Sequence, residues 1–372
     1  MASCSFIAVG DVAPDRDDPA TIFDAVRDRL RQSDLGFCQL EVNLTTRGAR
    51  VPQARHTMRG KPEIADALVD AGLGVVSFAG NHTMDWGPEG MLDTLANLER
   101  AGARHMGAGA NIMEARAPVI EERGGLRVGF LAVNSILPQN YWADEDKAGC
   151  APMRGHTVYE QIEHDQPGTP ARVHTFPHIE DLDALTASIR ALKAQVDVVI
   201  LSHHAGIHFV PAVVPDYQRT VGRAAIDAGA DMVLGCHAHI LKGMEFHRGK
   251  PIVHSLANFA LDLYMTPEHA ASRGFREIQT LSPDWVPDFS SSYNFPPDSR
   301  MSIAVEATLT PHGVTEFALL PVWIDSASRP RFLTRGEPEF DKVLSYLEKI
   351  TSMAGLATSY QAEGDRIVPQ PA

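Results

Sequence analysis

The sequence has little positive charge, few cysteines and no long apolar run. Its 372 residues carry a formal net charge of −14, so we expect no basic surface that could displace the counterions of nucleic acid, and nucleic acid is not an expected partner. No apolar run reaches the length of about 20 residues that spans a membrane. The first residues show neither a basic leader nor a long apolar segment. These absences predict a cytoplasmic protein without a membrane partner.

The four cysteines show neither paired spacing nor the spacing of a metal knuckle. Reduced, partly buried thiols in a cytosolic protein are therefore the simplest interpretation. One of them, Cys236, lies between candidate metal ligands, but its neighbours explain the site without it. Hydrophobic residues make up 44% of the chain, which is typical of a globular protein with a full core.

Short apolar runs alternate with segments of helical periodicity up to about residue 234. Each run is a predicted buried strand, and each periodic segment is a predicted helix. The predicted strands include 5–10, 35–40, 74–79, 126–134, 196–201 and 232–234, and the predicted helices are 19–32, 62–71, one beginning at 87, 179–195 and 217–228. Strands and helices that alternate in this way are typical of the α/β class.

After this region the pattern changes to strands that form hairpins. Two irregular insertions at about 135–178 and 259–300 interrupt the order, a helix is predicted at about 340–351, and the tail from Glu363 is predicted to fray. Because candidate ligands come from both ends of the alternating region, we predict one domain over 1–372.

Side chains that suit divalent metals follow five of the predicted strands. In open α/β sheets, the crevice beyond the carboxyl ends of the strands is where ligands bind. Oxygen donors combined with imidazoles suit manganese, iron, zinc or another divalent ion, and a carboxylate can bridge two ions. A polar rim of helix caps and loop residues is the alternative interpretation. The side chains are Asp11, Glu41, Asn81 with His82, His203 with His204, and His237 with His239.

Several short segments carry a family resemblance that covers most of 5–134 and 196–262. They are Gly10-Asp11-Val12 with Arg16, Leu40-Glu41, Arg59, Gly80-Asn81-His82 with Asp85-Trp86-Gly87, Gly107-Ala108-Gly109, Asn111 with Glu114-Ala115, His204-Ala205-Gly206, Gly229-Ala230-Asp231, Gly235–His239 and Ser255–Phe259. In this order they resemble the CapA-type family, named for capsule and poly-γ-glutamate synthesis proteins, within the calcineurin-like metallophosphatase superfamily. The resemblance implies a layered α/β/β/α sandwich with a metal site at the C-terminal ends of the strands.

The resemblance also implies a set of metal ligands. One divalent ion would be held by Asp11, Glu41 and His239, and a second by Glu41 as a bridge with Asn81, His204 and His237. One or two ions are expected, and manganese, zinc, iron and calcium stay open. Superfamily phosphatases usually carry a histidine where this chain has Ala13 and an aspartate where it has Glu41. The first ion therefore has only three implied protein ligands.

The predicted catalytic residues are His82, His203 and Asp85. The resemblance implies that His82 contacts the substrate and stabilises charge or donates a proton, while His203, beside His204, is a candidate proton carrier. Arg16 and Arg59 match arginines of the family pattern and are the predicted substrate-binding residues, for a phosphate or a peptide carboxylate.

Three functions stay open. In the first, which we favour, the metal polarises a peptide carbonyl and a histidine removes the proton from the adjacent carbon. The family includes members that epimerise ribosomally made lasso peptides, and this chain, without a visible anchor, resembles those. Aromatic residues of 259–300, namely Trp285, Phe289, Tyr293 and Phe295, would form a groove for the peptide substrate; ordinary packing within the loop is the alternative. The other two functions are a dinuclear metallophosphoesterase and an accessory protein of capsule or poly-γ-glutamate synthesis.

Overall fold

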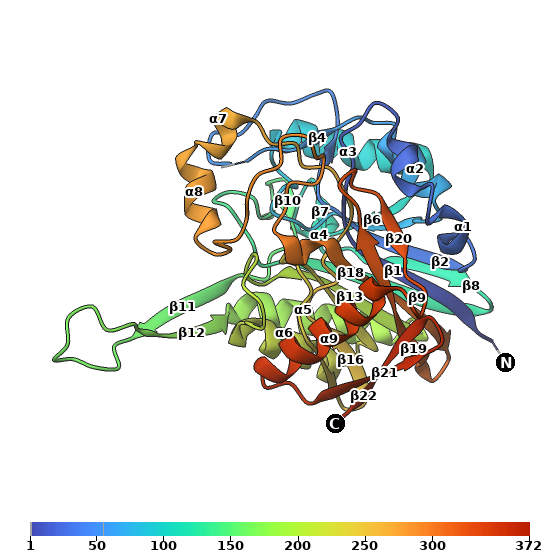
Figure 1. The fold of residues 1–372 in the computed structure, drawn as a ribbon. Helices are drawn as coiled ribbons and strands as arrows, with labels where there is room; N and C mark the ends of the chain where they lie inside the picture. The colour runs from blue at the N-terminus through green and yellow to red at the C-terminus, as the bar shows by residue number, and fades with distance from the viewer. Residues whose placement is uncertain (1, 55) are drawn as a thin grey trace.

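In the computed structural model, which describes residues 2–54 and 56–372, two β-sheets pack face to face and helices cover their outer faces (Figure 1). The larger sheet has the strand order β21-β22-β19-β18-β1-β2-β5-β6, with β17 beside β1 and β20 beside β19. Its strands are β1 (Cys4–Ala13), β2 (Leu35–Leu40), β5 (Val75–Ser77), β6 (Arg104–Met106), β17 (Asn258–Leu261), β18 (Met301–Thr310), β19 (Gly313–Ile324), β20 (Pro330–Phe332), β21 (Thr358–Glu363) and β22 (Arg366–Pro371).

The smaller sheet has the strand order β15-β16-β14-β13-β9-β8. Its strands are β8 (Val119–Arg123), β9 (Leu126–Asn134), β13 (Val198–Ala205), β14 (Met232–His237), β15 (Met244–His247) and β16 (Lys250–Val253). Strands β9, β13 and β14 run parallel, as do β1, β2 and β5 in the larger sheet. Parallel neighbours end at the same edge of a sheet, so each sheet presents a row of carboxyl ends.

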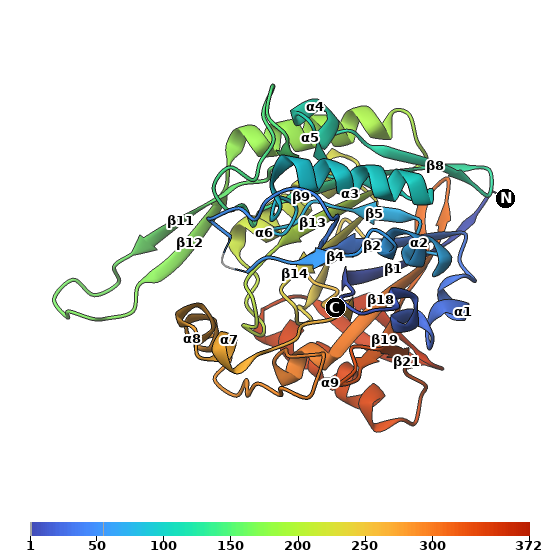
Figure 2. The ribbon, with the colours of Figure 1, turned by 90° about the horizontal axis from the view of Figure 1, so that it is seen from above.

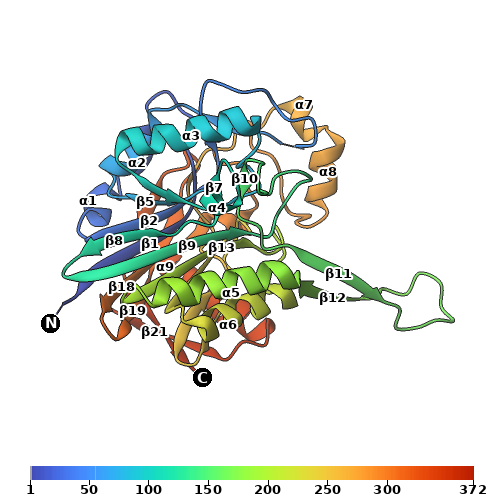
Figure 3. The same cartoon turned by 180° about the vertical axis from the view of Figure 1, so that it is seen from behind.

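Helices cover the outer face of each sheet (Figures 2 and 3). The larger sheet packs against η1 (Pro19–Phe23), α1 (Arg27–Leu30), α2 (Ile64–Asp70) and α3 (Gly87–Ala101), and the smaller one against α5 (Ile179–Lys193) and α6 (Asp216–Ala228). The remaining elements are β3 (Asn43–Leu44), β4 (Arg59–Gly60), β7 (Ala108–Gly109), α4 (Ile112–Ala115), β10 (Gly149–Cys150), β11 (Gly155–Glu160), β12 (Arg172–Pro177), α7 (Pro267–Ala270), α8 (Arg273–Gln279), η2 (Pro297–Arg300) and α9 (Pro338–Met353).

The central core lies between the two sheets. Phe6 and Phe37 from the larger sheet contact Phe130 from the smaller one, with ring centroids 6.0 and 6.5 Å apart. All three are buried, and burying an aromatic side chain contributes about 2–3 kcal/mol each. A second apolar cluster lies between the larger sheet and its helices, and a third lies between the smaller sheet and its helices. The predicted α/β/β/α sandwich is confirmed.

Several predicted boundaries are wrong because polar residues continue a strand. Strand β13 runs through His203 and His204 to Ala205, and β14 passes Gly235 to end at His237. These two strands pair residue by residue along this stretch, and ladder pairing holds polar residues in a strand as well as apolar ones. The helix predicted over 19–32 is instead two short helices, η1 and α1.

The insertions and the tail are more regular than predicted. The first insertion contains the hairpin of β11 and β12, which projects from the body (Figure 1), and the second contains α7 and α8. The tail from Glu363 does not fray. Strand β22 pairs with β21, and Ile367 is buried opposite Leu319 of β19, so both ladder bonds and core packing hold it. Among the described residues, no helix is both long and apolar enough to cross a membrane.

Candidate metal centre

The structure brings the six predicted metal ligands together at the carboxyl ends of parallel strands. The side chains come from the two packed sheets. The larger sheet supplies the oxygen donors and the smaller one the imidazoles. They are Asp11 in β1, Glu41 directly after β2, Asn81 in the turn after β5, His204 in β13, and His237 and His239 at and just after the end of β14.

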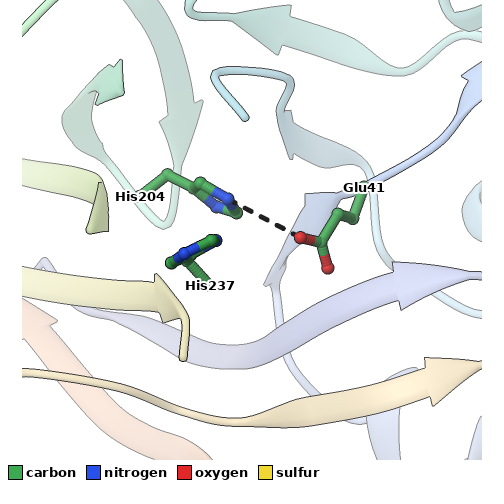
Figure 4. Close-up of side chains that lie close together, drawn as sticks. All are labelled: Glu41, His204 and His237. Carbon is green, nitrogen blue, oxygen red and sulfur yellow. Dashed lines mark ion pairs between the residues drawn. The ribbon is translucent and has the colours of Figure 1, made fainter. Parts of the chain in front are cut away.

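The first group of donor atoms surrounds one carboxylate oxygen of Glu41. Its Oε1 lies 3.6 Å from Nε2 of His204, and His237 lies beside them (Figure 4). The side-chain oxygen of Asn81 is 2.7 Å from His204 Nε2 and 3.0 Å from His237 Nδ1. Two nitrogens and two oxygens therefore face one point, which is a donor set that suits a borderline divalent ion.

The second group surrounds the other oxygen of Glu41. Nδ1 of His239 lies 3.7 Å from Glu41 Oε2 and 3.6 Å from Asp11 Oδ2. In each group, the donor atoms of the histidines and carboxylates lie within 4.8 Å of one another. Since both groups share Glu41, this carboxylate is placed to bridge two ions a few ångströms apart.

Unpaired buried atoms show that these residues fit divalent cations. Asp11 Oδ1, both carboxylate oxygens of Glu41 and His204 Nδ1 are buried and make no hydrogen bond. Buried polar atoms nearly always have a partner, and an unpaired buried carboxylate is costly. Cations between these atoms would satisfy the orphaned carboxylate oxygens, so the candidate site matches a divalent metal in donor type, number and charge.

Burial also sets the protonation of the donors in the metal-free protein. It raises the pKa of Asp11 to about 8, and together with the charges of Asp11 and Asp85 it holds the pKa of Glu41 well above its usual range. Burial lowers the pKa of His204 and His237 well below the usual value. The imidazoles are therefore neutral, which is the form that binds a metal.

The backbone around the ligands is strained. His237 and His239 have φ angles of 91° and 56°, in the left-handed region that residues other than glycine rarely adopt. The chain also passes very close to itself here, since a Cβ at Gly10 would lie 1.9 Å from the carbonyl oxygen of Ala257. Strained positions of this kind cluster at functional sites.

His82 lies beside this centre and is held by a buried carboxylate. Its Nδ1 is 2.7 Å from Asp85 Oδ2, and the other Asp85 oxygen accepts from the Tyr141 hydroxyl at 3.1 Å. The backbone N–H of Met58 donates to Asp85 as well, at 2.8 Å. Asp85 therefore fixes the ring of His82 and leaves Nε2 free, as expected of a pair that moves a proton.

His203 does not face the metal centre, because successive side chains of a strand point to opposite faces. Its Nε2 lies 2.8 Å from Ser135 Oγ, and the Ser135 hydroxyl donates to the carbonyl of Met153 at 2.6 Å. Ser135 therefore accepts from His203. Burial lowers the pKa of His203 to about 3, so the ring is neutral. These contacts are structural, and they do not favour the predicted catalytic role of His203.

Arg16 and Arg59 are both committed to protein partners. Arg16 binds Asp262 with two hydrogen bonds of 2.9 and 2.6 Å and donates to the carbonyl of Ala327. The guanidinium carbon of Arg59 lies 3.4 Å from the centre of the Trp86 ring, and its Nη2 donates to a backbone carbonyl. Substrate binding by these arginines stays a prediction, and their contacts do not favour it.

A cavity of about 180 Å³ lies directly beside the metal centre, and His239 belongs to both. None of the described residues that line it is Asp, Glu, Lys or Arg. Of the predicted aromatic groove, Trp285 and Phe295 line the cavity and Phe289 is exposed. Tyr293 is buried next to Phe295, with ring centroids 5.0 Å apart, but does not line the cavity. The lining residues are His56, Met58, His82, His208, Phe209, His239, Leu261, Leu263, Met265, His269, Ser272, Gly274, Phe275, Ile278, Trp285 and Phe295.

Sequence reasoning did not single out His208. Its ring centroid lies 4.0 Å from that of His237 and 5.0 Å from that of His239. Its Nε2 is buried without a hydrogen-bond partner, and burial lowers its pKa well below the usual value. The residue lies in the loop after β13, outside any strand-end pattern. In the sequence, only its position four residues after His204 pointed to a place near the metal ligands.

The fold is a layered α/β/β/α sandwich, and its two ligand groups form a candidate site for two divalent ions. The chain belongs to the family described as "Bacterial capsule synthesis protein PGA_cap", whose profile matches residues 5–263. The CapA-type resemblance is therefore confirmed.

Three relatives illustrate the family. Capsule biosynthesis protein CapA of Bacillus anthracis is 25% identical over 205 residues, which are 55% of this chain and 44% of the relative. PGA biosynthesis protein CapA of Bacillus subtilis is 26% identical over 201 residues, 54% of this chain and 46% of the relative. A "Probable polyglutamine synthesis accessory protein" of Mycobacterium tuberculosis is 29% identical over 270 residues, 67% and 65% of the two chains. The chain thus spans about half the length of the two CapA proteins.

Solved structures of low sequence identity align over nearly the whole chain. The calcineurin-like phosphoesterase YfkN from Bacillus subtilis aligns over 95% of this chain and 99% of its own, with 13% identity and a TM-score of 0.42. A hypothetical protein from Thermus thermophilus aligns over 85% and 98%, with 14% identity and a TM-score of 0.45.

Proposed function

We propose that this protein is a divalent-metal-dependent peptide epimerase, which inverts the Cα of a residue with an apolar side chain. The observation that carries the proposal is the cavity that shares His239 with the metal centre and whose described lining residues include no Asp, Glu, Lys or Arg. An apolar cavity of about 150 Å³ stays dry and accepts benzene. The cavity of about 180 Å³ is therefore large enough for one aliphatic or aromatic side chain of a peptide, and the family resemblance points to a peptide of lasso type.

The side chains around the cavity suit proton exchange at that Cα. Divalent ions bound at the centre would polarise the carbonyl of the bound residue and so acidify the adjacent C–H bond. His82 Nε2 removes the proton while Asp85 holds the ring. Of the other cavity histidines, His269 is the candidate to return a proton to the opposite face. Burial lowers the pKa of His56 to about 4 and that of His208 well below the usual value, so these two rings are neutral. One C–H bond breaks and one forms, so the composition of the peptide does not change.

The cavity away from the metal centre does not suit a substrate that carries several negative charges. Bound ions would pair with one anionic group, but the further carboxylates of a polyglutamate chain would need cationic side chains in the cavity, since buried charges are paired. The cavity lining contains no Lys or Arg among the described residues, and Arg16 is paired with Asp262. An uncharged peptide segment is therefore the better match for the cavity itself.

Exchange with heavy water tests the proposal. The metal-loaded protein is incubated in D₂O with peptides that carry apolar residues, and deuterium at Cα is measured by mass spectrometry and NMR. We expect one deuterium at one residue without cleavage of the chain, and His82→Ala should reduce the rate. His312→Ala, which alters an exposed turn histidine, serves as the control with unchanged rate. Absence of exchange across peptides with aliphatic and aromatic residues would contradict the proposal.

Two observations favour other functions, and the same preparation distinguishes them. The two ligand groups that share Glu41 favour a phosphoesterase, which would release phosphate from chromogenic esters at rates that depend on the metal. Membership of the capsule synthesis family favours an accessory role in polymer synthesis. That role predicts no turnover of either substrate, together with binding to a polymer-synthesis partner.

A further inference from the structure

The two halves of the metal centre differ in the number of donors assigned so far. The first half has four, from Glu41, Asn81, His204 and His237. The second half has three, from Asp11, Glu41 and His239. Asn258, the first residue of β17, lies beside the second half and is completely buried. It is the register partner of Asp11 in the neighbouring strand β1. Its side-chain oxygen lies 2.7 Å from Nδ1 of His239.

The position of Asn258 repeats that of Asn81 in the other half. Asn81 Oδ1 lies 2.7 Å from His204 Nε2, the same separation that joins Asn258 Oδ1 to His239 Nδ1. The shared carboxylate completes the match, because Glu41 lies 3.6 Å from the ring nitrogen of His204 and 3.7 Å from that of His239. Each half thus combines an amide oxygen, an imidazole nitrogen and one oxygen of Glu41 in nearly equal geometry.

A hydrogen-bond chain fixes which atom of the Asn258 amide faces the centre. The Tyr293 hydroxyl donates its only proton to the carbonyl of Ser299 at 2.5 Å. It can therefore only accept from Asn258, whose Nδ2 donates to it at 2.9 Å. This contact turns Oδ1 toward His239, and it assigns the amide without reference to the metal.

The contact between Asn258 and His239 has two chemical interpretations. Nδ1 is the nitrogen of His239 that lies near Asp11 and Glu41. If Nδ1 binds the ion it carries no proton, so Nδ1 and Oδ1 are two acceptors at 2.7 Å and need a cation beside them. Neighbouring donor atoms of an octahedral ion at about 2.1 Å lie about 3 Å apart, which is close to this spacing. In the other interpretation, Nδ1–H donates to Asn258, and the ring presents Nε2 elsewhere.

We propose that Asn258 Oδ1 is the fourth protein ligand of the ion that Asp11, Glu41 and His239 would hold. This inference rests on the metal centre of the proposed function and is independent of the peptide reaction. It makes each half of the centre a set of four donors around a shared carboxylate. It also gives the second insertion a role in metal binding, because Tyr293 from that segment holds the amide in place.

Manganese binding and a structure of the manganese-loaded protein test the proposal. In the loaded protein we expect an Asn258 Oδ1–Mn distance of about 2.2 Å, within the range of oxygen ligands. In calorimetric titration, wild-type protein should bind two ions, and Asn258→Ala should weaken one of them at least tenfold while the other changes less than twofold. Asn258→Asp should keep both ions, because a carboxylate oxygen replaces the amide oxygen.

Asn294→Ala is the matched control, since Asn294 is buried in the same insertion and bonds only to backbone atoms. It should leave both affinities unchanged. An Oδ1–Mn distance above about 3 Å, or unchanged affinities in Asn258→Ala, overturns the role of Asn258 while leaving the metal centre intact. A wild-type protein that binds no divalent ion overturns the metal centre itself and this inference with it. If Asn258→Ala does not fold, the distance in the wild-type structure decides.

Discussion

Replacement of Glu41 by glutamine should change stability in opposite directions with and without metal. Glu41 is completely buried, and neither carboxylate oxygen makes a hydrogen bond. In the metal-free protein its pKa is raised by burial and by the nearby charges of Asp11 and Asp85. Glutamine removes the unfavourable charge at nearly the same volume. The metal-free Glu41→Gln variant should therefore be at least as stable as the wild type.

With metal the order should reverse, because both donor groups lose their shared carboxylate. Loss of a group that merely supports a ligand costs about 10–100-fold in metal affinity, so loss of the bridge should cost at least ~100-fold per ion. At a metal concentration of ~1,000 times the wild-type Kd, an ion stabilises the fold by ~4.1 kcal/mol, and a ~100-fold weaker site gives only ~1.4 kcal/mol. The difference is ~2.7 kcal/mol per ion. For 372 residues the entropy of unfolding is about 0.8 kcal/mol/K, so each ion accounts for a loss of roughly 3–4 °C in the metal-induced rise of Tm.

Thermal unfolding in EDTA and in manganese measures both effects on the same samples. Glu41→Gln should melt at or above the wild type in EDTA and clearly below it in manganese. A variant that melts below the wild type by the same amount in both buffers would show that Glu41 is only a packing residue. That result would refute the bridging role.

Three further predictions concern proton transfer, the cavity and a buried lysine. His82→Ala should lower the rate of Cα exchange by ~10²–10⁴-fold without changing metal content, as measured by D₂O exchange and elemental analysis; lost metal would contradict the assignment. Trp285→Ala should cost ~3–5 kcal/mol in urea unfolding and raise KM for the peptide more than it lowers kcat, whereas an unchanged KM would exclude the cavity as the substrate site. Burial lowers the pKa of Lys242 from 10.5 to about 7; the unfolded chain therefore binds more protons between these values, and wild-type stability should rise with pH from about 7 to about 10.5. Lys242→Met should remove this slope. It should also raise the free energy of unfolding by up to ~5 kcal/mol near pH 6, at ~1.4 kcal/mol per pKa unit. A variant of equal or lower stability than the wild type at pH 6 would contradict the burial argument.

The sequence could predict those ligands that follow an apolar strand. Asp11, Glu41 and His237 each stand at or near the end of a buried run. Parallel pairing brings Asp11 and Glu41 to one sheet edge and His237 and His204 to another, and the packing of the two sheets then joins the two sets. His203 and His204 could not be told apart from position alone. Successive side chains of β13 point to opposite faces of the sheet, and the sequence does not show which face is turned to the metal centre. In the structure His204 is on that face, near Glu41, and His203 is on the other, near Ser135.

Other parts of the site depend on long-range packing, to which the pattern of buried strands and their ends does not point. Asn258 reaches the centre because β17 pairs with β1, across 247 residues of chain, and His208 reaches it from an irregular loop. The predicted frayed tail fails for the same reason. Ile367 is buried against β19, and nothing in the short segment around it signals that partner.

Anomalous diffraction from manganese-loaded crystals tests the central claim most directly. The account predicts two peaks a few ångströms apart that share Glu41, one near Asn81 and His204, the other near Asp11 and His239. No peak at these residues, or manganese bound only at sites elsewhere on the molecule, would contradict it.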